Sequence, residues 1–73
     1  MGVISTKKAF AQFILETRIK KNITQIDVAA KAHVTQGYLS KVEQGIQEPT
    51  LSNAIAICNA LGIDLNDFIN KHT

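Results

Sequence analysis

The side chains best placed to do chemistry in this 73-residue sequence form a polar, donor-rich set between residues 36 and 44. Leu39 and Val42 have the i, i+3 spacing of a helix, and if they point inward the polar residues around them point outward. The outward set is Gly37, Ser40, Lys41 and Gln44, with Gln36 in the first turn. Amide, hydroxyl and ammonium groups form hydrogen bonds with a partner surface, so the expected chemistry is recognition.

Two short helices with a tight turn are expected to position this set, over residues 24–45. Thr24 can cap the first helix, and Asp27 three residues later can complete a capping box, so the helix starts at Gln25. Its buried face has the i, i+4 spacing of Val28 and Ala32, with the small Ala29 beside them.

The apolar pattern breaks at His33 and Val34, and Thr35 can cap the second helix, which Gly45 closes. Two helices joined by about three or four residues are typical of the helix-turn-helix, whose second helix lies in the DNA major groove.

Catalytic, metal and cofactor chemistry find no support in the sequence. His33 and His72 have no visible partner for nucleophilic work, and no glycine-rich loop for phosphate is present. One cysteine cannot form an internal disulfide, and no His/Cys cluster has metal-ligand spacing. We expect no enzyme, no cofactor and no metal, and we expect Cys58 to be a small buried hydrophobic residue.

Composition indicates a single small domain over residues 1–73 in the cytoplasm. No apolar run approaches the ~18 residues that would span a bilayer, and no signal peptide is evident. A chain this short buries only roughly 60% of its unfolded surface, so a dimer would help its stability. The charge is uneven, because residues 1–42 have a net charge of +5 and residues 43–73 of −3. The basic part contains the two-helix unit, as phosphate binding would require.

The rest of the chain predicts three more helices and hence an all-α, compact five-helix domain. Ser5 or Thr6 can cap a first helix that ends near Lys21, and Asn22 can adopt the left-handed conformation that ends it. Lys20 and Lys21 can complement the helix dipole, contact phosphate, or do both. The expected buried residues of this helix are Phe10, Phe13, Ile14 and Thr17.

The fourth helix is expected from Leu51 to Leu61 with Thr50 as its cap, and Gly62 stops it. Its expected apolar stripe is Leu51, Ala54, Ile55, Cys58 and Leu61. A short fifth helix follows, capped by Asp64 with Asp67. It carries Leu65, Phe68 and Ile69, which could pack on the core or make a dimer contact.

In order along the chain, these residues resemble the DNA-binding domain of the lambdoid phage repressor and Cro family, the Xre-type helix-turn-helix family. The matching residues are Phe10, Ile14, Arg18, Ile23-Thr24-Gln25, Val28-Ala29, Val34, Tyr38-Leu39-Ser40, Glu43-Gln44-Gly45, Pro49-Thr50 and Leu61-Gly62-Ile63. The sequence departs from the family at His33, where glycine is common, so His33 is either strained or able to reach phosphate.

The resemblance implies roles for particular residues. Gln25 would bind phosphate and brace Gln36, whose amide would pair with the edge of adenine. Arg18 and Glu43 would form a structural ion pair. The implied base-reading residues are Gln36, Gly37, Ser40 and Lys41, and the implied phosphate-binding residues are Gln25, Thr35, Tyr38, Gln44 and Lys21. Tyr38 could equally be structural, and Gly37 could simply be tolerated.

The expected function is therefore a sequence-specific double-stranded DNA-binding transcriptional regulator, a repressor or autoregulator that binds an inverted-repeat operator as a homodimer. A restriction-modification controller or an antitoxin would have nearly the same sequence features. The alternative from another class is a protein-protein interaction module that holds a protein partner and binds DNA weakly.

Overall fold

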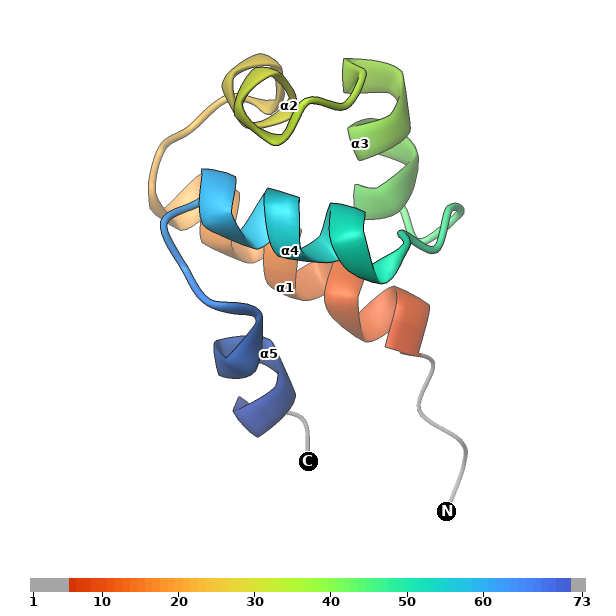
Figure 1. Ribbon diagram of the computed structural model, residues 1–73, viewed down its shortest axis with the longest axis vertical. Coiled ribbons are helices and arrows are strands. Elements are labelled where there is room, and N and C mark those ends of the chain that lie inside the picture. The colour runs from red at the N-terminus through yellow and green to blue at the C-terminus, as the bar shows by residue number, and fades with distance from the viewer. Residues whose placement is uncertain (1–5, 72–73) are drawn as a thin grey trace.

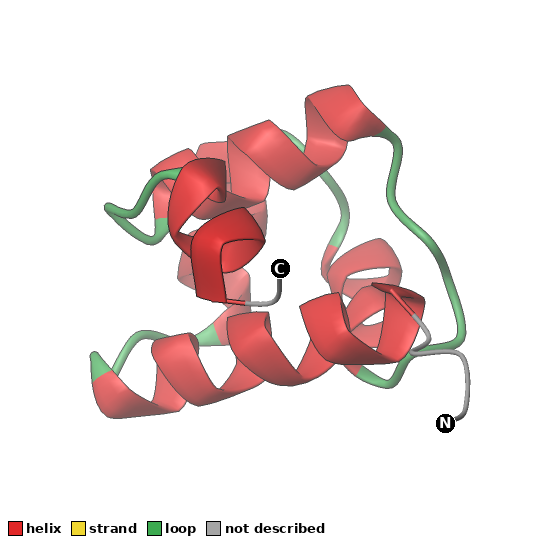
Figure 2. Cartoon of the chain, turned by 90° about the horizontal axis from the view of Figure 1, so that it is seen from below, coloured by secondary structure: helices red, strands yellow, loops and turns green. Residues whose placement is uncertain are grey.

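The computed structural model describes residues 6–71, and within this range the chain consists of five helices joined by loops (Figures 1 and 2). The helices are α1 (Thr6–Lys20), α2 (Gln25–Ala32), α3 (Gln36–Glu43), α4 (Leu51–Ala60) and α5 (Leu65–Lys71). The expected all-α, five-helix fold is confirmed. None of these helices is long and apolar enough to cross a membrane.

Threonine caps start three of the helices where the sequence predicts. The Oγ1 atoms of Thr24, Thr35 and Thr50 each accept a hydrogen bond from the backbone N–H three residues later, at 3.0–3.1 Å. At α5 the cap is reciprocal, since Asp64 N–H donates to Asp67 Oδ2 and Asp64 Oδ1 accepts from Asn66 N–H. These bonds satisfy backbone donors that have no partner inside a helix.

Left-handed residues end the helices and turn the chain. Asn22 and His33 have φ values of 61° and 59°, and Gly45 and Gly62 have 76° and 74°. His33 is the residue after α2, and its N–H donates to Ala30 O at 3.3 Å. A histidine at positive φ is less favourable than glycine, so the turn between α2 and α3 carries some backbone strain.

The core lies between the inner faces of all five helices. α4 packs against α2 and α5, while α3 packs against α1 and α2 (Figure 1). The core residues are Phe10, Ile14, Val28, Ala29, Ala32, Leu39, Val42, Ala54, Ile57, Cys58, Leu61 and Phe68. Burial, followed by the negative charges of Asp64 and Asp67, raises the pKa of the Cys58 thiol to about 11, so the thiol is neutral at pH 7.

The buried face of α4 differs from the expected stripe. Ala54, Cys58 and Leu61 are buried as expected, but Ile57 is fully buried as well, whereas Leu51 is 70% and Ile55 42% exposed. α4 turns Ile57 toward the core, and Ile55 is about 160° away from Ile57 at 100° per residue. The prediction that Leu51 and Ile55 share one apolar stripe with the buried residues of α4 was therefore wrong.

Candidate nucleic-acid interface

α2 and α3 lie together at one end of the molecule, and α5 lies at the other end (Figure 1). On α3, Leu39 and Val42 are buried, while Gln36, Gly37 and Lys41 are exposed, as is Gln44 directly after the helix. The Gln36 side chain makes no hydrogen bond to another residue in the described part of the chain. The polar face of α3 is therefore presented to solvent as the sequence predicts.

A buried ion pair fixes α3 to α1. Arg18 Nε lies 2.8 Å from Glu43 Oε2, and Arg18 Nη2 lies 3.0 Å from Glu43 Oε1. Arg18 Nη1 also donates to Ile23 O at 3.1 Å. The Glu43 side chain is only 3% exposed, so this two-bond contact keeps the carboxylate paired in a region that excludes water.

Gln25 joins this ion pair from α2. Its Nε2 donates to Glu43 Oε1 at 2.8 Å, so one carboxylate links α1, α2 and α3. We call Arg18, Gln25 and Glu43 the bracket. The amide of Gln25 is oriented by the buried negative charge of Glu43, and the expectation that Gln25 braces Gln36 stays a prediction.

Tyr38 connects α3 to α4. Its side chain is half-buried and packs against the core, and its Oη accepts a hydrogen bond from Asn53 Nδ2 at 3.0 Å. The phenolic oxygen therefore has a protein partner, while its proton remains available to donate. Both roles considered for Tyr38, structural and phosphate-binding, are compatible with this geometry.

The remaining polar residues of this region are partly engaged with each other. Thr35 Oγ1 accepts from Tyr38 N–H at 3.0 Å, and Gln44 Nε2 donates to Ser40 Oγ at 2.9 Å. Each hydroxyl still has a proton to donate. Ser40 is half-buried, so it is less accessible than its neighbours on the face of α3.

Lys21 lies away from this face. Its Nζ is 3.9 Å from the position that a Cβ on Gly62 would occupy, next to the carboxyl end of α4. A cation at a helix carboxyl end is favourable, so the geometry supports the dipole role, with α4 in place of α1 as the helix concerned.

A helix-turn-helix family model matches residues 14–68 of the chain. The chain belongs to the helix-turn-helix family. It is 32% identical over 62 residues to the immunity repressor protein of Bacillus phage phi105, a match that covers 85% of this chain and 43% of that protein. The chain thus spans less than half the length of this relative, and the resemblance inferred from the sequence is confirmed.

Solved structures of regulators have the same helix-turn-helix fold. The clp gene regulator ClgR from Corynebacterium glutamicum matches with a TM-score of 0.87 and 26% identity, over 93% of this chain and 72% of that one. The restriction-modification controller protein C.Esp1396I, as a tetramer in complex with its natural 35 base-pair operator, matches with a TM-score of 0.78 and 25% identity. That match covers 93% of this chain and 91% of the controller protein.

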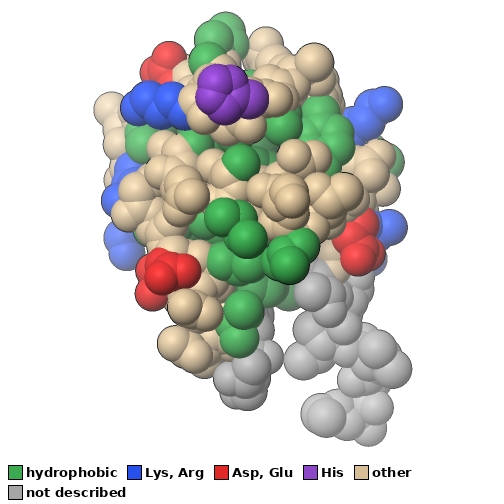
Figure 3. Space-filling view, in the orientation of Figure 1, with side chains coloured by type: hydrophobic (Ala, Val, Ile, Leu, Met, Phe, Trp, Pro, Cys, Tyr) green, Lys and Arg blue, Asp and Glu red, His purple; other side chains and the backbone are tan. Residues whose placement is uncertain are grey.

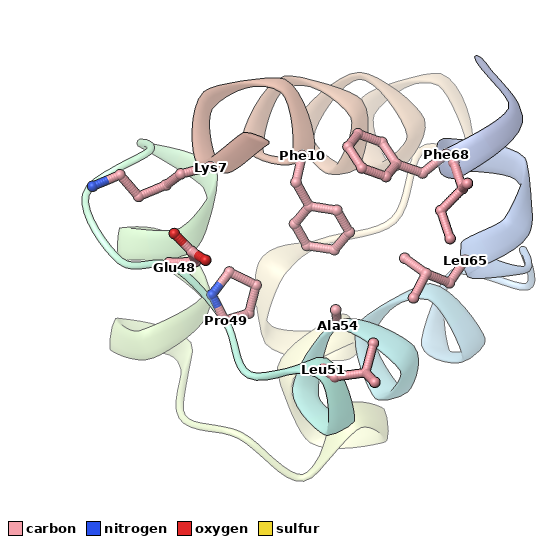
Figure 4. A pocket seen from close by; sticks show the side chains of 9 residues that line it. Lys7, Phe10, Glu48, Pro49, Leu51, Ala54, Leu65 and Phe68 are labelled. Atoms are coloured by element: carbon pink, nitrogen blue, oxygen red, sulfur yellow. The ribbon is translucent and has the colours of Figure 1, made fainter. Parts of the chain in front are cut away.

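An apolar groove of about 240 Å³ lies between α1, α4 and α5 of this helix-turn-helix protein (Figure 4). Phe10, Ala54 and Leu65 line it, with Lys7 and Glu48 at the end away from α5. Leu51 and Ile69 also line it and are 70% and 44% exposed. Figure 3 shows hydrophobic side chains gathered on this face of the molecule.

Phe68 does not offer a free apolar surface at this groove. Its ring is buried and lies 5.3 Å from the rings of both Phe10 and Phe13, edge-on to Phe10. Of the two roles considered for Phe68, core packing is the one that the structure shows. Leu65 is half-buried against the core, so Ile69 is the exposed residue among the three proposed for a dimer contact.

The hydrogen bond from Asn53 to Tyr38 was not predicted from the sequence. Asn53 follows a helix cap and lies 15 residues from Tyr38, and no local pattern links an asparagine there to a tyrosine on the preceding helix.

Proposed function

We propose that this chain is a sequence-specific double-stranded DNA-binding transcriptional regulator, a repressor or autoregulator that acts on an inverted-repeat operator. The observation that carries the proposal is the exposed polar face of α3, held in a fixed orientation by the bracket. A rigid helix that presents amide and ammonium donors fits the major groove, where each base pair has its own donor and acceptor pattern. The phage repressor and the operator-bound controller protein support the same role.

Base reading is assigned to residues on the exposed face of α3. The Gln36 amide can pair with N6 and N7 of adenine, and Lys41 can donate to O6 and N7 of guanine. Ser40 can donate its hydroxyl proton to a base. Among the described residues, no atom lies within 4 Å of where a Cβ on Gly37 would be, which leaves the backbone there open to a close approach of DNA.

Phosphate contacts are assigned to residues that flank this face. Thr35 and Tyr38 keep hydroxyl protons to donate, and the Gln25 amide keeps one N–H after its bond to Glu43. Gln44 has the same spare N–H. Lys21 would have to leave the end of α4 to join them. Such contacts set the register of the protein on the duplex.

A homodimer is the proposed binding form. Leu51 and Ile69 line the apolar groove and are exposed, as is Ile55 on α4, which makes this face the candidate contact. The groove lies between α1, α4 and α5, whereas the α3 face is at the other end of the molecule. Two copies could then place α3 helices in half-sites about 34–36 Å apart.

Binding, and not catalysis, is the proposed activity, since the relatives named above are regulators. Among the described residues, no three His, Cys, Asp or Glu side chains are grouped so that they could hold a metal ion. No cofactor is proposed, and the proposed location is the cytoplasm, where an operator would be reached.

The test is selection from a random pool of duplex DNA at near-physiological salt, because affinity depends steeply on salt. The purified chain is compared with a Gln36→Ala, Lys41→Ala double variant, whose changes are exposed and should leave the fold intact. Enrichment of an inverted repeat by the wild type alone supports the proposal. DNA retained without any motif, or no DNA retained, would instead favour the interaction module.

A further inference from the structure

We propose that Asn53 is a positioning residue for DNA binding, which orients the Tyr38 hydroxyl so that its proton is donated outward to a backbone phosphate. This inference rests on the proposed function. In this proposal α4 contributes to DNA recognition, because its residue Asn53 orients the Tyr38 side chain of α3.

The contact between Tyr38 and Asn53 joins α3 to α4. Tyr38 is the third residue of α3, and Asn53 is the third residue of α4. Asn53 Nδ2 lies 3.0 Å from Tyr38 Oη. Both side chains are half-buried, so neither is fully solvated. The backbone N–H of Asn53 donates to Thr50 Oγ1 at 3.1 Å, which ties the start of α4 to its cap.

The direction of this hydrogen bond decides what Tyr38 can do. A phenol has one proton to donate and an oxygen that accepts, and Asn53 donates to the oxygen. The Tyr38 proton then has to point to another acceptor. A phosphate oxygen only accepts, so a tyrosine whose oxygen is already occupied by an amide is prepared to donate to it.

An acceptor at residue 53 would reverse this arrangement. An aspartate there has nearly the shape of asparagine but only accepts hydrogen bonds, so it would take the Tyr38 proton for itself. Ser52 is the matched control residue, because it is exposed and next to Asn53 at the start of α4. Ser52→Asp adds the same negative charge near the DNA without a contact to Tyr38.

The experiment measures the dissociation constant of the full chain for its selected duplex, in which one phosphate at a time is replaced by a neutral methylphosphonate. The proteins are the wild type, Tyr38→Phe, Asn53→Ala, Asn53→Asp and Ser52→Asp. Thermal unfolding of each variant checks the fold. A residue that only supported the fold would change affinity for all duplexes alike, without changing which phosphate matters.

We expect one phosphate in each half-site to accept the Tyr38 proton, and its neutralisation should weaken wild-type binding roughly tenfold, the effect of a hydrogen bond to a charged group. Tyr38→Phe and Asn53→Asp should abolish this penalty, Asn53→Ala should reduce it, and Ser52→Asp should keep it. In the Tyr38→Phe background, Asn53→Ala should have no further effect on affinity.

An undiminished penalty in both Asn53 variants would overturn the inference while leaving the proposed function intact. So would fully additive losses from Tyr38→Phe and Asn53→Ala, because residues that act through one another are not additive. A wild type that selects no duplex would overturn the inference and the proposed function together.

Discussion

The Arg18 guanidinium meets the Glu43 carboxylate through two hydrogen bonds of 2.8 and 3.0 Å, and the residues are 25 positions apart in the chain. Glu43→Ala would leave the Arg18 charge without its partner, at a cost of about 3–5 kcal/mol. A chain of this length has a total stability of about 4–11 kcal/mol, so we expect the variant to lose a large part of its free energy of unfolding and to melt at a much lower temperature. Urea denaturation followed by circular dichroism measures the free energy of unfolding of Glu43→Ala and of the wild type.

The double variant Arg18→Met, Glu43→Leu is the control for the ion pair. It removes both charges and keeps similar volumes, so it should recover much of the lost stability. A double variant as unstable as Glu43→Ala would show that the hydrogen bonds from Gln25 and to Ile23 matter more than the charge balance.

Gln36→Ala should relax base preference at one position of each half-site and leave weak binding largely intact. The lost pairing with a base edge corresponds to about 1–3 kcal/mol of discrimination. Selection from a random duplex pool, repeated with the variant, measures the change. Gln12→Ala on the outer face of α1 is the matched control, because Gln12 is exposed and its side chain donates a hydrogen bond to Glu16 on the same helix. Unchanged preference in Gln36→Ala would reject the assigned role.

Ile69→Glu should give a folded monomer, because Ile69 is exposed beside the apolar groove and a charge there opposes contact between two copies. Sedimentation velocity and circular dichroism measure mass and fold. Ile26→Glu, on α2 and also exposed, should leave the dimer unchanged. A dimer that persists in Ile69→Glu would place the interface elsewhere.

Phe68→Glu should unfold the chain, in contrast to Ile69→Glu. The Phe68 ring is buried against Phe10 and Phe13, and removing such a ring costs about 3–5 kcal/mol even before a charge is introduced. The loss of the cooperative thermal transition measures this. A folded Phe68→Glu monomer would contradict the burial of the ring.

Stability should fall as the pH rises above 9, in part because of Cys58. Its pKa is raised in the folded chain from 9.0 to about 11, so between these values the unfolded chain releases a proton that the folded chain keeps. This contribution is complete below pH 9 and is lost as the pH rises through about 11. The slope of unfolding free energy against pH should be less negative in Cys58→Ala, which lacks the thiol and keeps every other side chain.

Local chemistry explains why the helix boundaries could be predicted. Thr24, Thr35 and Thr50 each satisfy a backbone donor three residues away, so the evidence for each helix start lies within four residues. Asn22 and Gly45 end helices for an equally local reason, their tolerance of positive φ.

The face that α4 buries could not be predicted in the same way. Its sequence has apolar residues on several sides, and only the placement of the neighbouring helices decides that Ile57 is buried and Leu51 is exposed. The Tyr38–Asn53 bond depends on the same placement. The ion pair of Arg18 with Glu43 came from family resemblance, because residues so far apart give no local pattern.

The bracket separates the side chains that hold α3 in place from those that α3 presents to solvent. Arg18, Gln25 and Glu43 orient α3 from behind, whereas Gln36 and Lys41 project from it without contributing to the core. Exposed substitutions away from structural contacts usually change stability by less than about 0.5 kcal/mol. The residues on the exposed face can therefore be exchanged while the scaffold beneath stays the same, so under the proposed function a new operator would require changes on this face alone.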